Sequence, residues 1–273
     1  MEEILATLSI DKKNNNQCQH FAFINNSCAC CKKTKNKCDN PTTIQLRYID
    51  PKLSLTLDAI RRVRDRDLET LLKRKKLHLV LDLDNTLIHT KKVNLKDRKK
   101  NKMGKDDDVF EILGGDWLVK LRPGTCHFLE RVSTMFDLSI YTMAEQSYAR
   151  EVGKLLEANM GVFDNNFCFT RVISKEHGTK SDRKGLDVVL SYERVVLNVD
   201  DCEEVWGEHK ANLIQIKPYN FFNQKSPLED DQDLARVLEV LSTVYNVFYD
   251  KKDRNFSGKD VRQVLENVRD QFD

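Results

Sequence analysis

A short apolar run that ends in acidic residues decides the fold class: residues 77–90 are LHLVLDLDNTLIHT. The run from Leu77 to Leu83 is mostly apolar and has the length of a strand rather than of a helix. Strands that are buried on both faces of a parallel sheet have this composition. The segments FDLSIYT (136–142) and RVVLNVDD (194–201) are also short apolar runs that end in polar residues. LIQI (213–216) is a candidate for a further strand.

Helical patterns lie between these predicted strands. Apolar residues recur at helical spacing in residues 124–135 and 148–160, and residues 185–190 predict a shorter turn of helix. Strands that alternate with helices predict the α/β class, with a parallel sheet covered by helices on both faces. In such sheets, ligands bind at the carboxyl ends of the strands.

Other segments surround this predicted sheet. Residues 91–108 hold 12 charged residues in 18 and predict a solvated insertion, whereas residues 109–121 predict a hairpin with glycines in its loop. Apolar periodicity predicts helices at 234–245 and 261–268. We expect four parts: a polar segment containing cysteine and histidine at 1–45, a helical lead-in at 46–76, a main domain at 77–225 and C-terminal helices at 226–273.

Composition and charge narrow the class of protein. The 273 residues include 45 Lys and Arg and 43 Asp and Glu, and no apolar run of about 18 residues is long enough to span a membrane. The start, Met1-Glu2-Glu3, lacks the basic and apolar regions of a secretory signal, which predicts a cytoplasmic or nuclear location. The net charge is near zero, but the charges are unevenly distributed along the chain. Residues 1–76 carry 16 basic and 9 acidic side chains, and the remainder is acidic.

Carboxylates follow two of the predicted strands at the point where each strand ends. Asp82 and Asp84 lie two residues apart, so both point to the same side, and Asp200 and Asp201 end the strand at 194–201. Four carboxylates at one sheet edge repel one another unless a cation lies among them, and oxygen ligands of this kind suit Mg²⁺. One carboxylate can then attack phosphorus and a second can transfer protons, while Thr142 and a lysine hold the phosphoryl oxygens.

Each of these features has a simpler explanation when it is taken alone. An Asp-x-Asp pair after an apolar run is often a turn or a helix cap, and Asp200-Asp201 alone is more often a turn that ends a strand. Their joint occurrence, each at the end of a buried strand, favours a site for phosphoryl transfer.

Six motifs connect this pattern to a known family. They are LDLDNTLIHT (81–90), VKLRPG (119–124), IYTMA (140–144), KGLDVV (184–189), VLNVDDCEEVW (196–206) and KPYNFF (217–222). Over about residues 45–270 the chain resembles the RNA polymerase II C-terminal-domain (CTD) phosphatases of the haloacid dehalogenase superfamily, and it is most similar to their plant branch. The resemblance implies a haloacid dehalogenase-like α/β fold, an FCP-type phosphatase domain at 77–225, and a small insertion in place of a large cap domain.

The resemblance implies a role for each aspartate. Asp82 matches the nucleophile, and Asp84 matches the general acid and base, whose backbone carbonyl also contacts Mg²⁺. Asp201 matches a direct ligand of the metal, and Asp200 is its neighbour. The implied reaction is hydrolysis of phosphoserine or phosphothreonine through an aspartyl-phosphate intermediate, with Mg²⁺ held by these four residues.

The resemblance also implies contacts with phosphate and substrate. Thr142 matches the phosphate-binding hydroxyl, and Lys184, at the start of KGL, matches the lysine that neutralises phosphate. Lys180 is a second candidate for that lysine, because the loop SKEHGTKSDRKG (174–185) is long and charged. Arg171 is either a contact for the phosphopeptide or a solvated arginine at the start of a strand.

Substrate and location follow from the same resemblance. Only 55 residues separate Thr86 from Thr142, which favours a protein-sized substrate over a small metabolite. The implied substrate is the phosphorylated heptad tail of RNA polymerase II in the nucleus, with general transcription factors as further partners and without direct contact to nucleic acid or membrane. The alternatives are a non-catalytic phosphopeptide-binding relative and a small-metabolite phosphatase of the same superfamily. Larger relatives continue into a BRCT domain, whereas this sequence stops at Asp273, which leaves its recruitment open.

The N-terminal segment carries a second set of candidate ligands. Cys18-x-His20 and Cys28-x-x-Cys31 supply four ligands in two close pairs, a spacing typical of tetrahedral Zn²⁺ sites. Cys30 and Cys38 leave the choice of ligands open, and unligated reduced thiols are the alternative. The basic run at 73–76 is either a nuclear localisation signal or a helix end that favours cations.

Overall fold

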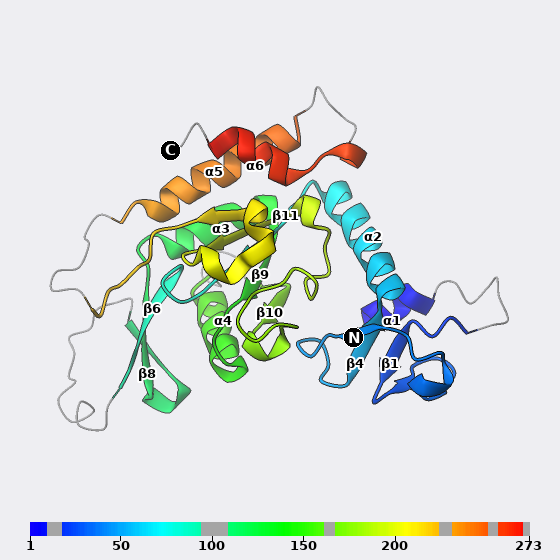
Figure 1. The fold of residues 1–273 in the computed structure, drawn as a ribbon. Helices are drawn as coiled ribbons and strands as arrows, with labels where there is room; N and C mark the ends of the chain where they lie inside the picture. Colours follow the sequence, from blue (N-terminus) through cyan, green and yellow to red (C-terminus); the bar gives the residue numbers. More distant parts are fainter. Residues whose placement is uncertain (10–17, 94–108, 161–166, 224–230, 251–255, 270–273) are drawn as a thin grey trace.

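The computed structural model describes residues 1–9, 18–93, 109–160, 167–223, 231–250 and 256–269. A five-stranded sheet forms its centre, and two smaller sheets lie at opposite sides of it, one of them built from N-terminal residues (Figure 1). None of the described helices is both long and apolar enough to cross a membrane.

The central sheet contains all four strands that the sequence predicts. Its order is β10 (Arg171–Ile173), β9 (Phe136–Tyr141), β5 (Leu77–Leu81), β11 (Val196–Asp200) and β12 (Leu213–Gln215). Every neighbouring pair is parallel, which confirms the predicted α/β class. The carboxyl ends of β5 and β11 therefore lie side by side, because these two strands pair directly.

Side chains alternate between the two faces of this sheet. Leu77, Leu79 and Leu81 of β5 enter the larger apolar core, together with Leu71 from the helix that precedes β5 and with side chains of four later helices. These helices are α3 (Thr125–Met135), α4 (Gln146–Met160), α5 (Asp233–Phe248) and α6 (Val261–Arg269). Val80 faces the opposite side, which is covered by the 3-10 helix η6 (Glu203–Asn212) and by residues 186–189. Two short helices precede β11: η4 (Lys175–His177) follows β10, and η5 (Glu193–Val195) adds Val195 to the larger core.

The predicted turn of helix at 185–190 is wrong, because this segment consists of turns and bends. Its carbonyl groups bind side chains from a distant part of the chain. The Arg64 guanidinium donates to the carbonyls of residues 186, 187 and 189, and the Tyr48 hydroxyl donates to that of residue 188. These hydrogen bonds hold residues 186–189 in an irregular conformation against Tyr48 and Arg64.

A small antiparallel sheet is formed by the part of the chain between β5 and β9. Its order is β6 (Ile88–Lys92), β8 (Trp117–Leu121) and β7 (Val109–Ile112). The pairing of β7 with β8 confirms the predicted hairpin, whose loop contains the 3-10 helix η3 (Leu113–Gly115). β6 takes up the start of the predicted insertion at 91–108, and residues 94–108 of that insertion lie outside the described residues.

The N-terminal residues form a sheet of their own that precedes a long helix. After α1 (Glu2–Ser9), the antiparallel strands have the order β2 (Ser27–Cys28), β1 (Ala22–Ile24), β4 (Leu53–Thr56) and β3 (Thr43–Gln45), with the 3-10 helix η2 (Lys35–Lys37) between β2 and β3. Helix α2 (Leu57–Arg74) begins at Thr56, whose side chain accepts a hydrogen bond from the backbone of Ala59. α2 links this sheet to the central one (Figure 1).

Two expectations concern this N-terminal region. The basic run at 73–76 forms the end of α2, where Lys75 adopts the left-handed conformation. Cations at this position interact favourably with the helix dipole, which supports the helix-end explanation, and nuclear localisation stays a prediction. The division into four parts also stays a prediction, and β3 and β4 pair across the expected boundary at 45 and 46.

Candidate active site

Three carboxylates meet at the carboxyl ends of β5 and β11. Asp82 follows β5, Asp200 ends β11 and Asp201 follows it, and one oxygen from each lies within 4.8 Å of the others. Asp82 and Asp200 are buried, and Asp201 is half-buried. Burial and the neighbouring Asp200 raise the pKa of Asp201. Hard oxygen ligands at this spacing fit a cation such as Mg²⁺.

Lys184 lies between two of these carboxylates. Its Nζ atom donates to Asp82 Oδ1 at 2.5 Å and to Asp200 Oδ2 at 2.5 Å. Burial alone would lower the pKa of Lys184, but the two carboxylates raise it above its usual value, so its ammonium group stays charged. The ammonium also lies 5.5 Å from the ring centre of Trp206 and 6.0 Å from that of Tyr141.

The charges of this cluster do not balance without a further cation. Burial raises the pKa of Asp82, and the adjacent Lys184 opposes that effect by favouring the carboxylate. When the three carboxylates are ionised, the single ammonium leaves two negative charges. A divalent cation would neutralise both charges, so the donor set fits Mg²⁺ in both chemistry and charge.

Asp84 is held apart from this cluster by hydroxyl groups. Its Oδ1 atom accepts hydrogen bonds from the Tyr148 hydroxyl at 2.5 Å and from Thr90 Oγ1 at 3.1 Å. Burial raises the pKa of Asp84, and these two hydrogen bonds partly counteract the rise. A carboxyl group with a raised pKa can hold a proton and then give it to a leaving group.

Two threonines stabilise the loops that carry the site. Thr142, directly after β9, is buried, and its Oγ1 atom accepts a hydrogen bond from the backbone of Ala144. Thr86 Oγ1 accepts from the backbone of Asp201 at 3.1 Å and donates to the Asp201 carboxylate at 3.3 Å. The loops after β5 and β11 are therefore tied together through Thr86.

A family model matches the chain over this fold and site. Residues 77–252 match the model described as NLI interacting factor-like phosphatase. This chain belongs to that phosphatase family. The match begins at β5 and extends beyond α5, so it contains every catalytic candidate.

The chain is also similar in sequence to named proteins. RNA polymerase II C-terminal domain phosphatase-like 4 of Arabidopsis thaliana is 36% identical over 93% of this chain and 62% of its own length. An RNA polymerase II C-terminal domain phosphatase of Caenorhabditis elegans is 26% identical over 98% of this chain and 43% of its own length. The chain thus spans about half the length of these relatives.

A solved structure confirms the fold that this family predicts. It is that of Fcp1, an essential RNA polymerase II CTD phosphatase, with a TM-score of 0.61 and 23% identity over 75% of this chain and 73% of the other. Likeness at this identity supports the haloacid dehalogenase-like fold alone.

The structure distinguishes between the two candidate lysines of this phosphatase fold. Lys184 contacts Asp82 directly, whereas Lys180 is exposed and pairs with Glu208 at 3.0 Å. Lys184 is therefore the lysine that the structure brings to the carboxylates. Its backbone N–H donates to the carbonyl of Val205, which holds the loop in place.

Arg171 is the predicted substrate residue that the structure does not bring to the cluster. Its guanidinium pairs with Asp67 of α2 at 3.6 Å and approaches His78 Nδ1 at 3.5 Å. His78 lies near the start of β5, whereas Asp82 follows its end. These neighbours favour a structural role for Arg171, and contact with a phosphopeptide stays a prediction without support from its surroundings.

Three residues at the site were not singled out from the sequence. Tyr148 of α4 holds Asp84, and Trp206 Nε1 donates to Asp200 Oδ2 at 2.8 Å. Arg122 follows β8 and is buried. Trp206 and Arg122 lie in the quoted motifs VLNVDDCEEVW and VKLRPG, which was the available signal, whereas Tyr148 resembles any apolar position of a helix.

Arg122 connects the loop after β5 to the start of α5. Its guanidinium makes two hydrogen bonds to Asp231, at 2.8 and 3.0 Å, and a third to Asp233 at 3.3 Å. It also donates to the backbone carbonyls of Thr86 and Lys217. A buried arginine that makes two hydrogen bonds to one carboxylate holds its partners in one geometry. Arg122 is therefore a positioning residue for the loop after β5.

Proposed function

We propose that this chain is a Mg²⁺-dependent protein serine/threonine phosphatase that acts on the phosphorylated heptad repeats of RNA polymerase II. The observation that carries the proposal is the contact of the buried Lys184 with both Asp82 and Asp200. In this proposal Asp82 is the nucleophile, and the Lys184 ammonium beside it can donate hydrogen bonds to phosphoryl oxygens. Family membership supports the reaction class, and the names of the relatives support the polymerase tail as substrate.

In the first step the Asp82 carboxylate attacks the phosphorus atom of a phosphoserine. A bond forms between a carboxylate oxygen and phosphorus, and the bond from phosphorus to the serine oxygen breaks. Asp84 gives its proton to the departing serine oxygen, a role that suits a carboxyl group whose pKa is raised by burial. The product of this step is an aspartyl-phosphate on Asp82.

In the second step water hydrolyses the aspartyl-phosphate. Asp84 is now ionised and takes a proton from the water as it attacks phosphorus. Inorganic phosphate leaves, Asp82 regains its carboxylate, and Asp84 is protonated for the next cycle. Lys184 and the Thr142 hydroxyl hold the phosphoryl oxygens during both steps.

The carboxylates of Asp82, Asp200 and Asp201, with the backbone carbonyl of Asp84, would hold Mg²⁺. When it is bound, Mg²⁺ neutralises the charge of the phosphoryl group and of the surrounding carboxylates. The three carboxylates already lie within reach of a common ion.

The small size of the antiparallel sheet supports a peptide substrate. Among the described residues between Thr86 and Thr142, the chain forms the strands β6, β7 and β8, the short helix η3 and the helix α3 before it enters β9 of the central sheet. These elements are much smaller than a domain that could enclose a metabolite, so the carboxylates face an edge that an extended peptide can reach. Action on the polymerase tail places the protein in the nucleus.

Asp82→Asn tests the proposal. The variant should release no phosphate from polymerase-tail peptides phosphorylated at each serine in turn, because an amide cannot form the aspartyl-phosphate. Asp182→Asn is the matched control, since Asp182 is an exposed aspartate of the Lys184 loop, and it should keep full activity. Chelation of Mg²⁺ by EDTA should stop the reaction of the unmodified protein.

Three results would contradict the proposal. Undiminished hydrolysis by Asp82→Asn would exclude Asp82 as the nucleophile. Tight binding of the phosphopeptides without turnover by the unmodified protein would indicate a binding relative. Faster hydrolysis of small phosphorylated metabolites than of the peptides would indicate a metabolite phosphatase.

A further inference from the structure

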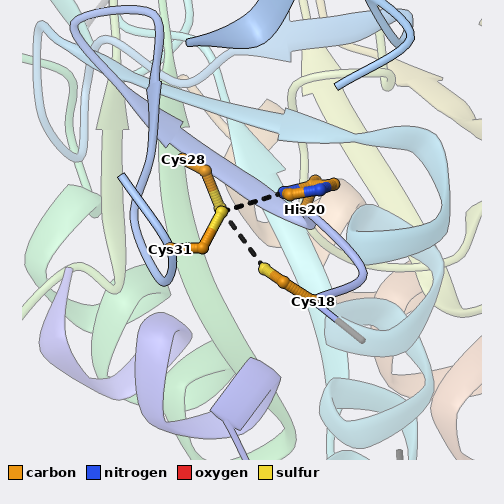
Figure 2. Close-up of side chains that lie close together, drawn as sticks. All are labelled: Cys18, His20, Cys28 and Cys31. Atoms are coloured by element: carbon orange, nitrogen blue, oxygen red, sulfur yellow. Dashed lines mark hydrogen bonds between the residues drawn. The ribbon is translucent and has the colours of Figure 1, made fainter. Parts of the chain in front are cut away.

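Four soft or borderline ligand groups meet in the N-terminal sheet, far along the chain from the catalytic residues. Cys18, His20, Cys28 and Cys31 each place one ligand atom within 4.8 Å of the others. Figure 2 shows the three sulfurs and the imidazole pointing toward a common centre. Cys28 is buried and the other three are half-buried, so the group is partly shielded from water.

Two distances between these atoms match the edges of a zinc tetrahedron. Zinc binds sulfur at about 2.3 Å and nitrogen at about 2.05 Å, so the S···S edge of a tetrahedron is about 3.8 Å and the S···N edge about 3.6 Å. Cys18 Sγ lies 3.7 Å from Cys28 Sγ, and Cys31 Sγ lies 3.4 Å from His20 Nδ1. A disulfide needs about 2.05 Å between sulfurs, so the Cys18 and Cys28 atoms are spaced as ligands and not as a bonded pair.

The local backbone forms two tight turns that produce this spacing. Asn25 and Asn26 both have positive φ angles and connect β1 to β2, which ends at Cys28. Lys32, directly after Cys31, also has a positive φ angle, and its N–H donates to the Cys28 carbonyl. The two cysteines of the C-x-x-C pair are therefore folded back toward each other, as a chelating knuckle requires.

We propose that Cys18, His20, Cys28 and Cys31 bind one structural zinc ion. Three sulfurs and one nitrogen in a tetrahedral arrangement select zinc over harder cations, and four protein ligands leave no open position for chemistry. Binding displaces the thiol protons into solution. Cys30 is exposed and lies outside the ligand set, and Cys38 is buried beside Phe23 and Cys28 without joining it.

The small size of the N-terminal sheet explains why a metal would matter. Its four strands are two to four residues long, so strand pairing alone contributes little to its stability. The segment between β3 and β4 contacts residues 174–190, which include Lys184: Arg47 donates to the carbonyl of Glu176, and Tyr48 donates to that of Val188. By stabilising the N-terminal sheet, the zinc ion would help to hold the loop that carries Lys184 in place.

Metal content and a cobalt spectrum test the zinc site independently of phosphatase activity. The full chain, purified without chelators, should contain about one equivalent of zinc, as a closed four-ligand site predicts. Replacement of the zinc by Co²⁺ should give a thiolate-to-metal charge-transfer band in the near ultraviolet. Carboxylates give no such band, so cobalt bound by Asp82 and its neighbours would not be mistaken for this site.

Single variants identify the ligands. Cys28→Ser and Cys31→Ser should each lose at least about nine-tenths of the zinc and the charge-transfer band, because three ligands bind far more weakly than four. Cys30→Ser changes the neighbouring thiol and should leave both unchanged. His20→Cys adds a fourth thiolate, so it should keep the metal and strengthen the band even if the serine variants fold poorly.

Four results would overturn the proposal, and a fifth would change its ligand set. The four are absence of zinc from the unmodified chain together with no charge-transfer band, full zinc retention in Cys28→Ser, loss of zinc in Cys30→Ser, and a disulfide between Cys18 and Cys28 in the freshly purified protein. Loss of zinc in Cys38→Ser with retention in Cys18→Ser would overturn this ligand set in favour of one that includes Cys38.

Discussion

Replacement of Lys184 by methionine removes the ammonium group between Asp82 and Asp200 and keeps a chain of similar length. The Lys184 side chain is 1% exposed, and the side chains of its partners are 8% and 2% exposed, so water cannot replace the lost contacts. Removal of one partner from a buried ion pair costs about 3–5 kcal/mol. We expect Lys184→Met to lower the free energy of unfolding of the metal-free protein by about that amount.

Mg²⁺ should separate the structural effect of Lys184→Met from its catalytic effect. A divalent cation among the carboxylates would restore part of the lost stability, because it neutralises the same charges. Activity should stay low at saturating Mg²⁺, since loss of a group that stabilises the transition state costs about 10²–10³-fold in turnover. Urea unfolding with and without Mg²⁺, together with phosphopeptide turnover, measures both effects.

Lys180→Met is the matched control for this experiment. Lys180 belongs to the same loop, but its side chain is 53% exposed and pairs with the exposed Glu208. Water can solvate both groups after the change, so stability and activity should match the unmodified protein. Equal unfolding free energies for Lys184→Met and Lys180→Met, or turnover by Lys184→Met at the unmodified rate, would refute the role of Lys184.

Three further predictions concern the surroundings of the site. Tyr148→Phe removes a hydrogen bond that lowers the pKa of Asp84, so the pH profile of kcat should shift to higher pH, and an unchanged profile would exclude this contact. Burial and Arg171 hold the pKa of His78 well below 6.5. As the pH falls below about 6.5, this histidine therefore takes up a proton only in the unfolded chain, and the free energy of unfolding falls by up to about 1.4 kcal/mol per pH unit. Urea midpoints should show a shallower acid slope for His78→Asn, and equal slopes would contradict a neutral His78. Arg122→Met should cost about 3–5 kcal/mol, measured by urea unfolding, because it leaves a buried carboxylate unpaired, and a loss below about 1 kcal/mol would contradict its positioning role.

The strands of the central sheet could be predicted because their signal is local. Each is a short apolar run that ends in polar residues, and parallel sheets buried on both faces leave this pattern in the sequence. β6 was missed, because its sequence IHTKK ends in charged residues and its pairing with β8 depends on residues about 30 positions later. The N-terminal strands were missed because they are too short to show periodicity.

The site could be predicted in part for a related reason. Asp82, Asp200 and Asp201 were found because the ends of parallel strands meet at one edge of the sheet. The position of Tyr148 depends on how α4 packs on the sheet, which no local pattern encodes. The shape of residues 185–190 likewise depends on Arg64, which lies more than 120 residues earlier in the chain.

The central position of β5 has a consequence for biosynthesis. β5 is the first strand of its sheet to be made, yet its two neighbours, β9 and β11, begin at residues 136 and 196. Until the ribosome has made β9 and β11, the apolar residues of β5 have no neighbouring strand with which to pair. Lys184, which pairs with Asp82, is made 102 residues after it. Such late pairing slows folding and leaves a nascent chain with an exposed aggregation-prone strand, which is a substrate for chaperones. The geometry that brings Asp82, Asp200 and Lys184 to one edge of the sheet thus makes the growing chain dependent on protection until most of it has been synthesised.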